Sequence, residues 1–194
     1  MNVSIKHDGF TIKLDDRVLI NHSHKAPCAY IGKGRETIKM HVGNFDVQDE
    51  IIERIPLESF EIEKERDIYI IRLFHIDKSN VFEMKVFEKD GRLRIVTKGN
   101  ESFNRSWLRL AACKDEYVYG GGEQFSHFNL RGRKFPIFTT EQGVGRNKKT
   151  MTTVLADCND GGGGDYWTTF FPQPTFITSN KYYCHIDNGE YQVL

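Results

Sequence analysis

Apolar and polar residues alternate with a period of two along most of the chain. The stretch 10–14 alternates before the pair Asp15-Asp16, and the pattern returns at 81–87. Such alternation, broken by Asp, Asn and Gly, is typical of antiparallel strands joined by tight turns. The sequence therefore predicts an all-β chain built as an antiparallel β-sandwich. A helix is compatible with the pattern only at Asp49–Arg66, where Pro56 interrupts it.

The composition fits one folded domain over residues 1–194. Hydrophobic residues make up 39% of the chain, and 27 basic residues balance 27 acidic ones. A chain of this length buries about 70% of its unfolded surface, which is enough for a sizeable core. The zero net charge disfavours a general nucleic-acid binder. No apolar run approaches the roughly 20 residues that cross a bilayer, so we expect neither nucleic acid nor membrane as a partner.

The cysteines and the N-terminal residues together indicate a reducing cellular compartment. Cys28, Cys113, Cys158 and Cys184 are widely spaced and form no C-x-x-C pair, and residues 1–8 lack the apolar stretch of a signal peptide. Disulfides are rare in reducing compartments. We therefore expect four free thiols and a cytoplasmic location.

The segment 117–165 differs from the alternating parts. It holds 10 of the 17 glycines, and six basic residues lie between 131 and 149 against the single acid Glu141. Long Gly-rich loops in compact domains are uncommon and are usually functional or disordered. Because aromatic residues are also frequent here, disorder is disfavoured, and we expect any chemistry of this chain to lie in this loop segment.

The sequence contains no complete phosphate-binding or metal-binding motif. The glycines 120–122 lack the Gly-Lys-Ser/Thr of a phosphate loop. Asp157 begins a stretch that departs from a calcium loop, because Gly161 and Thr168 stand where acidic or amide ligands are needed. His22 and His24 have no nearby third ligand. We expect no metal and no cofactor.

The polar residues of this segment suit a ligand pocket. Carboxylates, amides and guanidinium groups occur together there, and such groups satisfy hydroxyls that both donate and accept hydrogen bonds. A sugar pocket is one interpretation. A solvated basic face and a buried polar network are the alternatives, and the residues alone do not separate them.

Ordered motifs in this part of the chain resemble a known family. They are Tyr119-Gly120-Gly121-Gly122-Glu123-Gln124-Phe125, Leu130-Arg131-Gly132-Arg133-Lys134-Phe135-Pro136, Thr140-Glu141-Gln142-Gly143-Val144-Gly145-Arg146-Asn147 and Phe170-Phe171-Pro172-Gln173-Pro174. The chain resembles the N-terminal, galactose-mutarotase-like β-sandwich of glycoside hydrolase family 31, and within it the bacterial sulfoquinovosidase branch. The match is close from about Arg105 to Asp187 and looser before it.

The resemblance implies a parent activity but not a complete enzyme. Family members are retaining α-glycosidases, and their catalytic aspartates lie in a (β/α)8 barrel that follows this sandwich. The 194 residues contain no such barrel, so the resemblance implies no catalytic residue here and no activity for this chain alone. The implied function is that of an N-terminal domain of a glycosidase acting on α-sulfoquinovosides. A stand-alone carbohydrate-binding or interaction module and a truncated, inactive product remain alternatives.

The resemblance also nominates substrate-binding residues. In the family a loop of this domain reaches the mouth of the barrel and contributes to the pocket. Glu123 is the first candidate for a substrate contact, followed by Gln124, Glu141 and Arg146. The alternative role for these side chains is a buried network that braces the loop. The implied partners are a carbohydrate substrate and the catalytic barrel.

Overall fold

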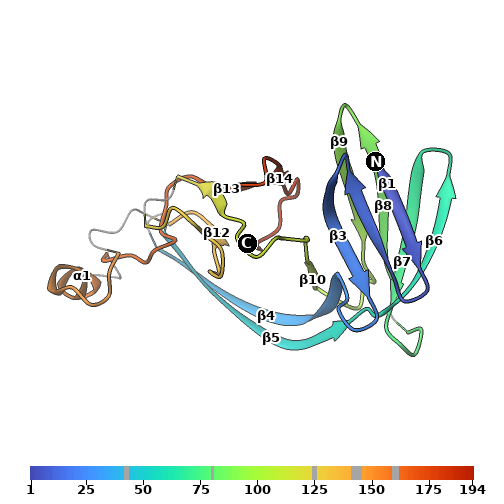
Figure 1. Cartoon of the computed structure of the whole chain (residues 1–194). Helices are drawn as coiled ribbons and strands as arrows, with labels where there is room; N and C mark the ends of the chain where they lie inside the picture. Colours follow the sequence, from blue (N-terminus) through green and yellow to red (C-terminus); the bar gives the residue numbers. More distant parts are fainter. Residues whose placement is uncertain (42–43, 80, 124–125, 141–145, 159–161) are drawn as a thin grey trace. The chain divides into compact units, whose positions relative to one another are not determined.

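Strands make up most of the computed structural model, which describes residues 1–41, 44–79, 81–123, 126–140, 146–158 and 162–194 (Figure 1). The chain divides into two units. Unit 1 comprises Met1–Glu36 and Asp49–Ala112, and unit 2 comprises Thr37–Gln48 and Cys113–Leu194. The predicted fold class is confirmed, because the described sheets are antiparallel and residues in strands far outnumber residues in the helix.

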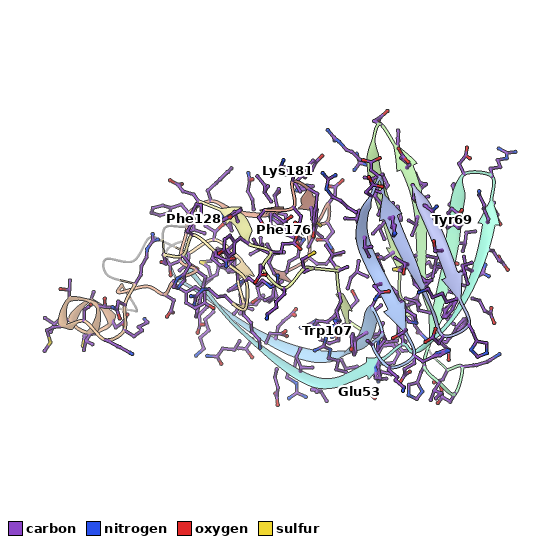
Figure 2. All side chains as sticks on the ribbon, in the orientation of Figure 1. Glu53, Tyr69, Trp107, Phe128, Phe176 and Lys181 are labelled. Carbon is purple, nitrogen blue, oxygen red and sulfur yellow. The ribbon has the colours of Figure 1, made fainter. Side chains whose placement is uncertain are left out.

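Two antiparallel sheets lie entirely within unit 1. The first has the strand order β1-β2-β3, with β1 at Asn2–Lys6, β2 at Gly9–Leu14 and β3 at Arg17–Ser23. The second has the order β6-β7-β8-β9, with β6 at Ser59–Glu65, β7 at Ile68–Phe74, β8 at Val81–Lys89 and β9 at Arg92–Lys98. On the second sheet, the Lys64 ammonium lies 5.1 Å from the centroid of the Tyr69 ring on the neighbouring strand. Tyr69 is labelled in Figure 2.

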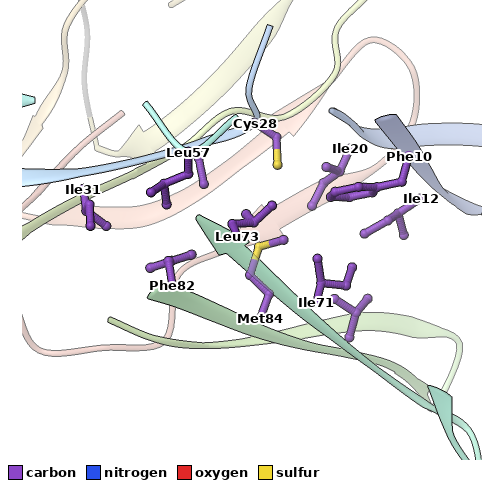
Figure 3. Packing of buried hydrophobic residues seen from close by; sticks show 12 residues of the cluster. Phe10, Ile12, Ile20, Cys28, Ile31, Leu57, Ile71, Leu73, Phe82 and Met84 are labelled. Carbon is purple, nitrogen blue, oxygen red and sulfur yellow. The ribbon is translucent and has the colours of Figure 1, made fainter. Parts of the chain in front are cut away.

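The core of unit 1 draws side chains from both of these sheets (Figure 3). Phe10, Ile12 and Ile20 come from the first sheet, and Ile71 and Met84 from the second, and each is at most 1% exposed. Each sheet thus buries one face against this cluster, which is the arrangement of a β-sandwich. Cys28 lies in the same cluster, and burial raises the pKa of its thiol to about 12. All four cysteines are free.

A third sheet has the order β10-β4-β5, with β4 at Ala29–His41, β5 at Asn44–Pro56 and β10 at Arg105–Leu108. Together β5 and β6 occupy the stretch Asp49–Arg66, so the possible helix there is wrong. Pro56 is the last residue of β5, where the N–H that proline lacks is not needed to continue a ladder. Ile62 of β6 pairs with Ile71 of β7, and this pairing favours the strand over a helix.

Unit 2 has shorter elements. One sheet has the order β11-β13-β14, with β11 at Val118–Gly122, β13 at Pro172–Thr178 and β14 at Tyr183–His185, and a second pairs β12 (Pro136–Ile137) with β15 (Gln192–Val193). The helix α1 spans Met151–Asp157, and Thr150 caps its N-terminus by accepting a hydrogen bond from the Thr153 N–H at 3.4 Å. Across the described ranges, no helix has the length and apolar character needed to span a membrane.

Buried His22 predicts an acid sensitivity of unit 1. Its ring stacks on Phe10 with centroids 4.8 Å apart, Nδ1 accepts from the Cys28 N–H at 3.3 Å, and Nε2 lies 3.1 Å from the Glu58 carbonyl oxygen. Burial lowers the pKa of His22 despite the hydrogen bond to Glu58. Protons therefore bind the unfolded state more readily. We expect the free energy of unfolding to fall as the pH drops below about 6.5.

Urea unfolding between pH 7.5 and 5 measures this dependence. His22→Gln keeps a donor and an acceptor but does not titrate, so its stability should change less over this range. His75→Gln is the matched control, because Asp77 raises the pKa of the partly exposed His75, and removing His75 therefore cannot abolish a loss of stability on acidification. An equally steep dependence in His22→Gln would contradict the assignment.

Candidate functional site

Three consecutive glycines shape the end of β11. Gly120, Gly121 and Gly122 have φ angles of +125°, +78° and +96°, and the register with β13 shifts between Gly120 and Gly122. A Cβ on Gly121 would lie 2.8 Å from the ring of Phe135, which is 1% exposed. A Cβ on Gly122 would lie 2.0 Å from the Phe171 carbonyl oxygen. The chain thus bends sharply here and packs closely on its neighbours.

Glu123 follows this bend with its backbone held on both sides. Its N–H donates to the Phe171 carbonyl oxygen at 3.0 Å, and its carbonyl oxygen accepts from the hydroxyl of Thr169. The same hydroxyl accepts from the Phe171 N–H at 3.2 Å, and Thr169 is only 1% exposed. The Glu123 side chain is exposed. A fixed backbone therefore presents this carboxylate to solvent.

The other candidate residues are held elsewhere or lie outside the description. Arg146 has a φ of +54°, and its N–H donates to the Gly163 carbonyl oxygen at 2.7 Å. Its side chain is partly buried. Gln124 and Glu141 lie outside the described residues. The backbones of Glu123 and Arg146 are thus fixed by different segments of unit 2.

Several cations of the basic segment have structural partners. The Arg131 guanidinium donates to the carbonyl oxygens of Cys113 and Glu116, and the second distance is 3.0 Å. The Lys148 ammonium lies 2.9 Å from a carboxylate oxygen of Asp157. These two cations therefore stabilise unit 2. Their contacts favour the interpretation as a polar network over that of a ligand pocket.

A buried carboxylate that the sequence did not reveal anchors the start of unit 2. Glu116 is 2% exposed, and its carboxylate accepts from the Cys113 N–H at 2.9 Å. Tyr182, which precedes β14, also hydrogen-bonds to Glu116. Burial, together with the negative charge of Glu116, raises the pKa of Tyr182 to about 12. Glu116 therefore links the turn before β11 to the β13–β14 hairpin.

Large aromatic side chains are exposed around the Glu123 loop. Phe128, which is labelled in Figure 2, is 83% exposed. Phe170 and Phe171 are 54% and 58% exposed. The Phe128 ring lies 4.7 Å from the Tyr119 ring between centroids. Exposed apolar side chains that gather near one another often mark an interaction site.

Comparison with known families supplies the identity of this fold. Residues 3–153 match the model of the glycosyl hydrolase 31 N-terminal galactose mutarotase-like domain. The chain belongs to this family. This family 31 domain is 44% identical over 186 residues to the sulfoquinovosidase of Escherichia coli strain K12. The aligned region covers 95% of this chain and 27% of that relative.

Two further relatives agree with this membership. The sulfoquinovosidase of Agrobacterium fabrum is 38% identical over 202 residues, covering 100% of the family 31 domain and 28% of the relative. A solved family 31 sulfoquinovosidase from E. rectale, in complex with an aza-sugar inhibitor, matches 100% of the chain with a TM-score of 0.87 and 38% identity. That match covers 28% of the solved chain, so this chain spans little more than a quarter of its relatives.

The described part of this family 31 domain contains no cluster of three or more His, Cys, Asp or Glu side chains that could hold a metal ion. Thr169 was not a candidate from the sequence, because a threonine beside Thr168 and Phe170 carries no motif. Its role becomes evident only from the hydrogen bonds that join it to Glu123 and Phe171.

Proposed function

We propose that this chain acts as the N-terminal domain of a sulfoquinovosidase-type glycosidase and contributes Glu123 to the substrate pocket. Support comes from relatives that bear this name and are matched over 95% and 100% of the chain. Hydrolysis with retention needs two carboxylates about 5–5.5 Å apart across the scissile bond. We assign that pair to the part of the relatives that lies outside these 194 residues, and we assign no catalytic residue here.

The observation that carries the proposal is the exposed Glu123 carboxylate on a backbone held from both sides. A carboxylate accepts hydrogen bonds from several hydroxyls at once, which suits a sugar or the glycerol portion of a glycoside. Because Thr169 and Phe171 fix the backbone, little conformational freedom is lost when a ligand binds. Carboxylate-pair hydrolysis uses water as the co-reactant, and we propose no cofactor or metal.

A chimeric enzyme tests the proposal. The N-terminal segment of the Escherichia coli sulfoquinovosidase that aligns with this chain would be replaced by residues 1–194. Both the chimera and the isolated chain would be assayed with chromogenic α-sulfoquinovoside and α-glucoside. We expect the chimera to hydrolyse the sulfoquinovoside and the isolated chain to show no turnover above a blank.

The Escherichia coli protein without its N-terminal segment is the control, and we expect it to be inactive. Turnover by the isolated chain that a mutation within it abolishes would show that the active site is misplaced. A folded chimera without activity would contradict the role as an N-terminal domain of such an enzyme.

A further inference from the structure

The sheet β10-β4-β5 carries two arginines of unit 1 in different electrostatic surroundings. Arg105 on β10 contacts two carboxylates, with its guanidinium 2.8 Å from an Asp49 oxygen and also paired with Glu36. Its charge is therefore compensated by the protein. Arg54 on β5 has no carboxylate within 4.0 Å among the residues that the structure describes.

Two aromatic rings hold the guanidinium of Arg54 instead. Its central carbon lies 4.3 Å from the Tyr30 ring centroid and 4.8 Å from the Trp107 ring centroid. Tyr30 and Trp107 are cross-strand partners on β4 and β10. We call these three side chains the Arg54 platform; Arg54 is exposed, and both rings are partly exposed.

Gly32 fixes the orientation of the indole. A Cβ at this position would lie 3.0 Å from the Trp107 ring, so the ring rests against the bare backbone of β4. Glu53 precedes Arg54 and points to the other face of the sheet by strand alternation, as the labels of Glu53 and Trp107 in Figure 2 indicate. The adjacent carboxylate of Glu53 therefore does not compensate the positive charge of the platform.

A stacked guanidinium is a prepared receptor for an oxyanion. Contact with ring faces holds its plane but uses none of its N–H groups, which remain free to form paired hydrogen bonds to a sulfonate or carboxylate. Aromatic faces also attract the C–H groups of a sugar ring, because their π-electrons are negative. The guanidinium that would bind the anion and the rings that would contact the sugar lie next to each other in the Arg54 platform.

We propose that the Arg54 platform binds a hexose that carries an anionic substituent, with the substituent on Arg54 and the sugar ring against Tyr30 or Trp107. The site is formed by residues of unit 1, whereas Glu123 belongs to unit 2. Binding at the platform does not depend on turnover, so its failure would leave the proposed hydrolytic role untouched, and the converse also holds.

Titration of the 194-residue chain by NMR tests the site. The probes are methyl α-sulfoquinovoside, methyl α-glucoside and sodium sulfate. We expect saturable binding of the sulfoquinovoside, with the largest amide shifts around residues 30, 54 and 107. We expect the glucoside and sulfate each to bind about tenfold more weakly, because each offers only one of the two kinds of contact.

Variants assign the contacts. Arg54→Gln should weaken sulfoquinovoside binding by about tenfold or more, and Arg54→Lys, which keeps the charge but loses the planar fork, should weaken it less. Lys64→Gln is the matched control, because it removes a cation that also lies over an aromatic ring of unit 1, and it should leave the affinity unchanged.

The proposal is overturned by equal affinities for sulfoquinovoside and glucoside, by sulfate binding as tightly as the sugar, or by an unchanged affinity in Arg54→Gln. Melting temperatures confirm that each variant is folded. If Arg54→Gln does not fold, the wild-type shift map decides, and shifts confined to residues away from 30, 54 and 107 overturn the assignment.

Discussion

Replacing Gly122 by alanine is expected to lower the free energy of unfolding of unit 2 by about 2–5 kcal/mol. The new Cβ would lie 2.0 Å from the Phe171 carbonyl oxygen and 2.7 Å from the Gln173 nitrogen, and both are backbone atoms. Such overpacking costs about 1–3 kcal/mol. The φ of +96° adds about 1–2 kcal/mol for a residue with a Cβ. Moving Phe171 away would also break its hydrogen bond with the Glu123 N–H.

Gly132→Ala is the matched control for this substitution. Gly132 also has a positive φ, +76°, but a Cβ there meets no atom within 4 Å. It should therefore cost only the backbone term of about 1–2 kcal/mol. In a Trp107→Phe background, the fluorescence of Trp167 reports denaturant unfolding of unit 2. Equal losses in the two alanine variants would show that the close approach at Gly122 does not matter.

Glu123→Gln in the chimeric enzyme is expected to lower kcat/KM for an α-sulfoquinovoside by about 10- to 150-fold. The change keeps the shape of the side chain and removes its charge, so a charge-assisted hydrogen bond to a substrate hydroxyl is lost. Because the side chain is exposed and the described bonds of Glu123 are made by its backbone, the melting temperature should change little.

A bracing role for Glu123 predicts the reverse pattern, with a lower melting temperature and kinetics that stay largely intact in the folded molecules. Measuring both quantities on the same preparation separates the two roles. Glu101→Gln, an exposed carboxylate of unit 1, controls for the loss of one charge. A stable Glu123→Gln chimera with unchanged kcat/KM would remove Glu123 from the pocket.

The strands of unit 1 could be predicted because their signal is local. Phe10 and Ile12 are 1% and 0% exposed on β2, and the Asp15-Asp16 turn joins β2 to β3 as the alternation indicated. Period-two patterns reflect burial of one face of a strand, which a single stretch of sequence records. The third sheet was less evident, since Asp49–Arg66 reads equally as an interrupted helix.

The helix α1 shows where this reasoning fails. Met151, Val154 and Leu155 have helical spacing, yet they are 71%, 45% and 64% exposed, and the buried member of the helix is Thr153. A short helix without a buried apolar face has a weak signature. Among the described residues, the helix is stabilised by the Thr150 cap and by nearby polar contacts, and a hydrophobic pattern does not reveal such contacts.

The candidate site was predictable in part. The family resemblance nominated Glu123, and the positive φ angles of the glycines before it and its exposed carboxylate fit a bend that presents this side chain. The residues that hold the bend are distant in sequence. Phe135 packs on Gly121, and Thr169 binds the Glu123 carbonyl oxygen. Such long-range partners follow from tertiary packing, so the sequence around Glu123 does not contain them.

The division of β4 and β5 between the two units makes the halves of this chain topologically inseparable. Residues Thr37–Gln48 belong to unit 2, although the segments on both sides of them belong to unit 1. Within unit 2, Phe45 packs on Phe138 with ring centroids 4.9 Å apart. Unit 2 therefore cannot assemble from the continuous stretch after Ala112. It also needs residues 37–48, which precede that stretch by more than 60 residues, so its folding closes a long loop and is coupled to that of unit 1.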